Sequence, residues 1–146
     1  MEVSFKYQEF THNRYSATAF LNKKPVGQID GNINIDGKIT CSIKVNQGFE
    51  RQGIGYVLHE KIINELSKLR EIKVFESTWL VDEEFQSYPN MMSTNLLVFL
   101  ECLENDFNLN DCAFYTPTGK ILRRLGFKTC EVLYYSESET KVNFYL

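Results

Sequence analysis

The segment that most constrains this chain is FERQGIGYVL, residues 49–58. It places Gly53 and Gly55 where an alternating apolar and polar stretch gives way to residues spaced with the period of a helix. A glycine-containing turn between a strand and a helix leaves backbone N–H groups unbonded at the positive end of the helix dipole. Such a turn binds anions, phosphate groups among them. The segment therefore predicts an anion site, beside the simpler role of capping a helix.

The residues before this segment predict four strands. Apolar and polar residues alternate, as they do in half-buried strands, over 3–10, 14–22, 25–35 and 38–45. We expect turns at residues 23–25 and at Asp36-Gly37, a dipeptide that favours a type I′ turn. Short turns between consecutive strands predict an antiparallel meander.

The residues after the segment predict alternating helices and strands. The expected elements are a helix at about 53–70, a strand at 72–81, a helix capped by Ser93, a short strand at 112–116, a helix at 117–125 and two final strands. Leu96, Leu97, Leu100 and Leu103 would share one face of the second helix. Pro117 and Gly126 mark the start and the end of the third.

Length and composition limit the class of protein. A chain of 146 residues fits one domain, residues 1–146, and its 43% of hydrophobic residues is enough for a globular core. The longest apolar run, 96–100, is far short of the roughly 20 residues that span a bilayer, so we expect no membrane helix. The first residues lack the features of a secretory signal, which predicts a cytoplasmic protein. Four scattered cysteines without a CxxC pair predict no metal site.

The glycine spacing separates the phosphate-binding motifs. A Walker A loop needs GxxxxGK[ST], which this chain lacks. A Rossmann fingerprint needs GxGxxG after a first strand, but Leu58 takes the third glycine position and four predicted strands come first. What remains is QxxGxG or RxxGxG, at the start of the helix that follows a fourth strand.

These residues resemble the GNAT superfamily of N-acetyltransferases. The match consists of Val45, Phe49, Gln52, Gly53, Ile54 and Gly55, and KILRRLGFK at 120–128 is similar to the second signature of the family, a helix that ends in Leu-Gly-Phe. Two positions depart from the pattern: Gln47 replaces a frequent proline, and Glu50 replaces Gln or Arg. A carboxylate beside a diphosphate is unfavourable, so Glu50 must point away or weaken coenzyme binding unless Arg51 and Gln52 compensate.

The resemblance implies a fold, a co-substrate and a reaction. The fold is an α/β (α+β) arrangement, a mixed central sheet of about seven strands flanked by helices, here with an acidic helical insertion before the last helix. The co-substrate is acetyl-coenzyme A, without a metal, and the family match implies binding by Ile43, Val45, Arg51, Gln52, Gly53, Ile54, Gly55 and Tyr56. The reaction is direct acetyl transfer to a primary amine in a ternary complex, with the backbone N–H of Val45 polarising the thioester carbonyl.

Two side chains are candidates for proton transfer. Glu76 is the preferred acceptor for the amine proton, with Asp30 and Glu50 as weaker alternatives, and a structural, hydrogen-bonded glutamate is the competing interpretation. Leu122 occupies the position where the family commonly has the tyrosine that protonates the coenzyme thiolate. Tyr115 or Ser77 would replace that tyrosine, or no acid is needed because thiolates leave readily.

Residues 82–111 carry seven carboxylates and no lysine or arginine. They form either a substrate lid that attracts a cationic amine, with Phe85, Tyr88 and Met91 against its alkyl stem, or a solvated helix that covers the core. The formal net charge of −3 argues against a nucleic-acid partner, and no membrane partner is expected.

Two further functions compete with an acetyltransferase that acts on the amine of a small molecule or a protein. One is a catalytically inactive GNAT-fold module that binds acyl-coenzyme A, which Glu50 and Leu122 would favour. The other is a toxin-like acetyltransferase of aminoacyl-tRNA, which the acidic charge disfavours. The oligomeric state is left open, with a homodimer as one option.

Overall fold

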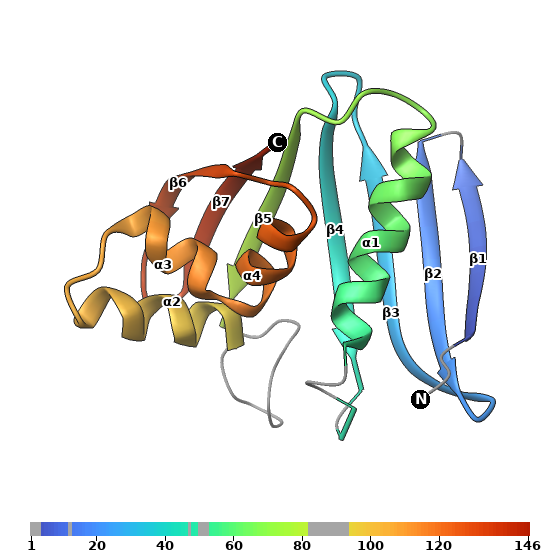
Figure 1. The fold of residues 1–146 in the computed structure, drawn as a ribbon, viewed down its shortest axis with the longest axis horizontal. Helices are drawn as coiled ribbons and strands as arrows, with labels where there is room; N and C mark the ends of the chain where they lie inside the picture. Colours follow the sequence, from blue (N-terminus) through green and yellow to red (C-terminus); the bar gives the residue numbers. More distant parts are fainter. Residues whose placement is uncertain (1–3, 12, 47, 50–52, 82–93) are drawn as a thin grey trace. The chain divides into compact units, whose positions relative to one another are not determined.

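A computed structural model describes residues 4–11, 13–46, 48–49, 53–81 and 94–146. The chain divides into two compact units, Met1–Lys73 and Val74–Leu146. Within the described residues, seven strands and four helices follow one another (Figure 1).

The first unit begins with the four predicted strands, joined as an antiparallel meander. They are β1 (Ser4–Thr11), β2 (Arg14–Leu21), β3 (Lys24–Ile33) and β4 (Lys38–Val45), and each pairs with the next along the chain. The alternation of apolar and polar residues therefore predicted these strands correctly.

Both predicted turns differ in detail. The β2–β3 turn consists of Asn22 and Lys23, both at positive φ as in a type I′ turn, and it begins one residue before the expected segment 23–25. At the β3–β4 connection only Gly37 has positive φ, and its N–H donates to the carbonyl of Asn34. The side-chain oxygen of Asn34 also accepts from the N–H groups of Asp36 and Lys38, so a turn capped by asparagine, with one left-handed glycine, replaces the expected type I′ turn.

Helix α1 (Ile54–Ser67) packs on β2, β3 and β4, as Figure 1 shows. Glycines on β3 allow the close approach. A Cβ atom at Gly27 would lie 3.2 Å from side-chain atoms of both Ile54 and Leu58, and one at Gly31 would lie 3.0 Å from Ile62. Ile54, Leu58 and Ile62 are all buried, so the apolar stripe of the helix fits into the space that the two glycines leave.

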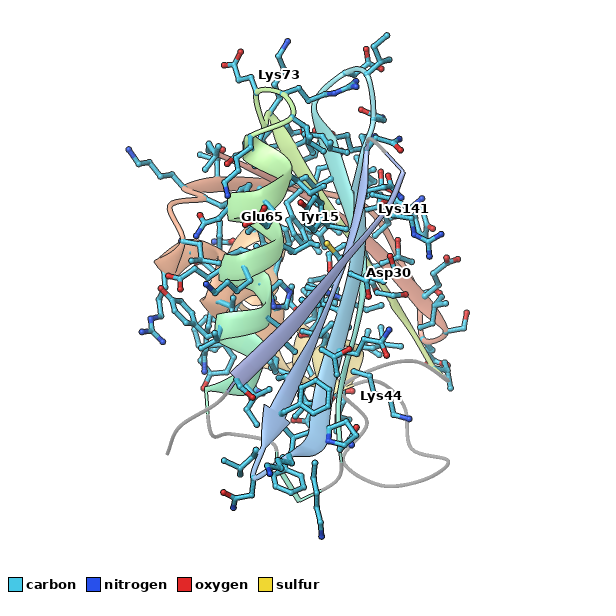
Figure 2. All side chains as sticks on the ribbon, turned by 90° about the vertical axis from the view of Figure 1, so that its right-hand side faces the viewer. Tyr15, Asp30, Lys44, Glu65, Lys73 and Lys141 are labelled. Atoms are coloured by element: carbon cyan, nitrogen blue, oxygen red, sulfur yellow. The ribbon has the colours of Figure 1, made fainter. Side chains whose placement is uncertain are left out.

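The other face of this sheet is polar. Asp30 accepts a bidentate ion pair from Arg14, in which Nε and Oδ1 are 2.9 Å apart. Figure 2 shows Asp30 and Lys44 on the side of the strands away from α1. An antiparallel sheet with one covered and one solvated face explains the alternation in the sequence.

The second unit holds a three-stranded antiparallel sheet and three helices. Strand β7 (Glu139–Tyr145) lies between β5 (Val74–Leu80) and β6 (Thr129–Tyr135). The helices α2 (Thr94–Glu104), α3 (Leu109–Tyr115) and α4 (Pro117–Arg124) contribute to the buried core. That core contains aromatic pairs such as Phe75 with Phe127 and Phe114 with Phe144.

Two expectations for the helices were wrong. Residues 112–116 belong mostly to α3 and not to a strand, because the side chain of Asn108 accepts from the N–H of Asp111 and caps a new helix. In α2 the buried residues are Asn95, Leu96 and Phe99 instead of four leucines. Asn95 makes two buried hydrogen bonds to Thr118, which tie α2 to the first turn of α4.

Helix α4 begins and ends as its sequence predicts. The hydroxyl of Thr116 accepts from the N–H of Gly119, and Pro117 occupies the first turn. Gly126 has a φ of 105°, and the N–H of Phe127 donates to the carbonyl of Leu122. No helix in the described part of the chain combines the length and apolarity that crossing a bilayer requires.

Candidate coenzyme and acceptor sites

The N-terminus of α1 has the backbone geometry of an anion site. Gly53 precedes the helix at φ 82° and ψ 1°, a left-handed conformation in which its carbonyl accepts the N–H of Val57 at 3.1 Å. The amides of Ile54, Gly55 and Tyr56 therefore precede the first hydrogen bond within the helix. The helix has 14 residues and no acidic residue in its first turn. No carboxylate of that turn therefore offsets the positive end of the helix dipole.

A buried histidine supports this first turn. His59 is 1% exposed, and its Nδ1 lies 2.7 Å from the carbonyl oxygen of Gly55. A carbonyl only accepts hydrogen bonds, so Nδ1 carries the proton of the neutral ring. Burial lowers the pKa of His59 to about 4, against a weaker opposing effect of this hydrogen bond. The imidazole therefore adds no positive charge at neutral pH.

Several predicted coenzyme-binding residues face the core. Ile43 is 6% exposed and Ile54 is 2% exposed, so these two would contribute backbone groups and not side chains to a ligand. Val45 ends β4 opposite Gly27, and Tyr56 is half-buried with its hydroxyl 3.5 Å from Glu60. Arg51 and Gln52, together with Gln47 and Glu50, lie outside the described residues. The binding roles of all of these residues stay predictions.

Glu76 lies on β5, directly opposite Asn143 of β7. Its side chain is 16% exposed, and Oε1 is 3.7 Å from Nζ of Lys141. Since neighbouring residues of a strand point to opposite faces, Glu76 lies on the face opposite Phe75 and the helices. The candidate base is thus a partly buried carboxylate that already has a cationic neighbour. Asp30, the alternative, is held by Arg14 in the first unit.

Tyr115 lies at the end of α3, on the helix-covered side of the β5–β7–β6 sheet. It is 58% exposed, and Nζ of Lys120 lies 4.4 Å from its ring centroid. Ser77 accepts a hydrogen bond from Nε1 of Trp79 at 2.8 Å, and Leu122 is fully buried. The structure therefore does not bring Tyr115 and Glu76 together. In the predicted reaction, Glu76 would act on the amine nitrogen and Tyr115 on the sulfur of the coenzyme.

The sequence reading missed two polar residues. His59 had no role in it, although the four-residue spacing from Gly55 is the spacing of one helical turn. Asn143 is buried on β7 beside Glu76, and a polar residue in an apolar run such as KVNFYL was the available signal. Among the described residues, no group of three His, Cys, Asp or Glu side chains is placed to hold a metal ion.

Comparison with known proteins identifies the fold. No protein-family model and no curated protein matches the sequence. Solved structures do match. The chain is similar to a GNAT-family acetyltransferase from Streptococcus pneumoniae, with a TM-score of 0.54 and 12% identity over 92% of this chain and 67% of that one.

Two further structures show the same likeness. The ribosomal-protein-S18-alanine N-acetyltransferase of Escherichia coli gives a TM-score of 0.53 and 14% identity over 98% of this chain and 91% of that one. The PaiA N-acetyltransferase of Thermoplasma acidophilum, in complex with coenzyme A, gives 0.54 and 12% over 92% and 62%. This chain therefore has the GNAT fold, as the residues at 45–55 and 120–128 predicted.

Proposed function

We propose that this protein is an N-acetyltransferase that transfers an acetyl group from acetyl-coenzyme A to a primary amine. One observation carries the proposal. In a chain with the GNAT fold, a left-handed Gly53 opens α1 directly after a four-stranded meander and presents amides with no acidic residue in the first turn. The similar PaiA N-acetyltransferase of Thermoplasma acidophilum is a complex with coenzyme A, which supports the same class of ligand for this chain.

The proposed reaction needs one proton acceptor and one oxyanion donor. The neutral amine attacks the thioester carbon, a C–N bond forms, and the C–S bond breaks. The nitrogen loses one proton to Glu76, and the thiolate of the coenzyme takes up one proton from Tyr115 or from water. The backbone N–H of Val45 would stabilise the negative charge on the carbonyl oxygen. The products are an N-acetylated amine and coenzyme A.

The first test is thermal unfolding with and without acetyl-coenzyme A, because it requires no knowledge of the acceptor. Ligand at 100 times its dissociation constant stabilises the folded protein by about 2.7 kcal/mol. In a domain of this size the midpoint should rise by roughly 5 °C. No rise at saturating concentrations would contradict the coenzyme assignment.

The second test separates turnover from binding. Free coenzyme A should appear when an amine is added, and Glu76→Gln should lower kcat much more than the affinity for acetyl-coenzyme A. Glu131→Gln is not a suitable control, because Glu131 lies on the same sheet face. Glu71→Gln removes an equal charge from an exposed position of the first unit. Equal kcat in the Glu76 variant would assign the proton acceptor to another group.

An inactive acyl-coenzyme A-binding module is the second candidate. The ion pair of Glu76 with Lys141 favours it, since a carboxylate that already has a cationic partner is a poorer acceptor for an amine proton. Coenzyme binding without release in the presence of any amine would identify such a module.

A further inference from the structure

The face of the β5–β7–β6 sheet opposite its helices carries a row of oxygen acceptors. Cross-strand pairing places Glu76 of β5, Asn143 of β7 and Glu131 of β6 side by side. Opposed residues in an antiparallel sheet share a face, so all three side chains project from the same side. This is the side opposite Phe75, Phe144 and the helices. We call Glu76, Asn143 and Glu131 the acceptor row.

The charge around the row is negative. The described residues of this face include three carboxylates, those of Glu76, Glu131 and Glu139, and one ammonium group, that of Lys141. Glu131 accepts a hydrogen bond from the hydroxyl of Tyr145 at 3.4 Å, and it forms no ion pair with a described residue. A second positive charge would therefore be attracted to this face.

Asn143 gives an independent indication of a ligand. The residue is 8% exposed, and its Oδ1 is buried with no hydrogen-bond partner among the described residues. Buried polar atoms in folded proteins nearly always have a partner, and one without a partner needs an explanation. Because Asn143 stands between two glutamates, a donor bound to the row would satisfy the amide oxygen and a carboxylate together.

The face already accommodates an alkylammonium group. Nζ of Lys141 lies 3.7 Å from Oε1 of Glu76 and 5.9 Å from the ring centroid of Tyr134. A carboxylate and an aromatic ring are the two groups that bind such cations in proteins. Figure 2 shows Lys141 on the side of its strands away from the helices.

We propose that the acceptor row binds a substrate with two cationic nitrogens, a diamine, and that Glu131 and Asn143 hold the nitrogen that does not react. This inference rests on the proposed function, in which Glu76 takes the proton of the reacting amine. Adjacent strands are about 4.8 Å apart, so the backbones at Glu76 and Glu131 are roughly 10 Å apart. Two side chains that lean toward each other across β7 would match the nitrogens of a short α,ω-diaminoalkane.

The test compares acceptors of equal length that differ in one charge. The protein is assayed for coenzyme A release with 1,4-diaminobutane and with n-butylamine. We expect kcat/KM to favour the diamine by roughly fivefold to tenfold, the value of one hydrogen-bonded charge contact. Glu131→Gln should reduce this preference to near one, and Glu71→Gln, at an exposed position of the first unit, should retain it.

The outcomes distinguish this inference from the proposed function. Equal kcat/KM for both amines, or a preference that survives Glu131→Gln, overturns the diamine site and leaves the acetyltransferase intact. Turnover with neither amine, while 1,4-diaminobutane raises the melting temperature of the natural protein more than that of Glu131→Gln, supports the site and contradicts the acetyltransferase. Absence of both turnover and stabilisation overturns the site as well.

Discussion

Nζ of Lys141 lies 3.7 Å from Oε1 of Glu76, on neighbouring strands of the second unit. The two side chains are 29% and 16% exposed, so the pair is largely removed from solvent. An ammonium group in this position has the chemistry of the proposed substrate. Lys141 is therefore both a counter-ion of the candidate base and a competitor for the place where an amine would bind.

Replacement of Lys141 should test this competition. In Lys141→Met the alkyl chain remains and the charge is lost, so we expect KM for a primary amine to fall by about twofold to fivefold. Lys128→Met removes an equal charge from an exposed position and should leave KM unchanged. Steady-state kinetics with varied amine concentration measures both. An unchanged or higher KM in Lys141→Met would show that the ion pair assists binding instead of opposing it.

The buried imidazole of His59 should make stability depend on pH. Its pKa is lowered to about 4 in the folded protein from 6.5 when exposed, so the unfolded chain binds the proton first as pH falls. This contribution is fully present above pH 6.5 and is lost progressively toward pH 4, with a total of about 3 kcal/mol. Urea unfolding at pH 7.0 and 5.0 measures the loss.

His59→Gln provides the comparison, because a glutamine can still donate to the carbonyl of Gly55 but does not titrate. The variant will have a lower stability at pH 7, and the decisive quantity is its slope between pH 7.0 and 5.0. A slope as steep as that of the natural protein would mean that other groups, and not His59, carry the pH dependence.

The sequence predicted most of the backbone and less of the side-chain chemistry. Strands β3 and β4 and helix α1 follow from periodicity, because each has one face that is mostly buried and one that is not. The strand expected at 112–116 was wrong because the cap at Asn108 outweighed the β propensity of Phe114 and Tyr115. Local propensity is a weak guide where one capping hydrogen bond starts a helix.

The arrangement of the candidate site depends on contacts between distant residues. Glu76 could be identified from its strand, but its neighbours Asn143 and Lys141 follow from the register of β5 with β7, which no local pattern fixes. The same holds for Asn95 and Thr118, which are 23 residues apart in the sequence. By contrast, the turn at Gly53 could be predicted because its signal lies within a few consecutive residues.

The N-terminus of α1 can be tested with two glycines that share a conformation. Gly53 and Gly126 both have positive φ, and a Cβ atom at either position would meet no atom closer than 3.8 Å. An alanine at each should cost about 1 kcal/mol of stability from backbone strain. Only Gly53→Ala should lower the affinity for acetyl-coenzyme A, by roughly tenfold, because the added methyl group would obstruct the approach of a phosphate to the backbone amides. Calorimetric titration measures the affinity of both variants for acetyl-coenzyme A. Equal affinities would contradict an anion site at this turn.

The last prediction concerns the cost of the acceptor row in the absence of a ligand. The buried Oδ1 of Asn143 has no hydrogen-bond partner within the described residues, and such an atom costs about 1–3 kcal/mol. Asn143→Leu is close in volume and removes the polar atom, so the free energy of unfolding should rise by about 1 kcal/mol while the preference for 1,4-diaminobutane falls. Thr140→Val is the control, because Oγ1 of Thr140 is also buried without a partner in the described part of the chain, but it lies opposite Trp79 on the helix-covered face. It should raise stability without changing the preference. If both variants keep the preference for 1,4-diaminobutane, Asn143 has only a structural role and does not contribute to binding of the second ammonium group.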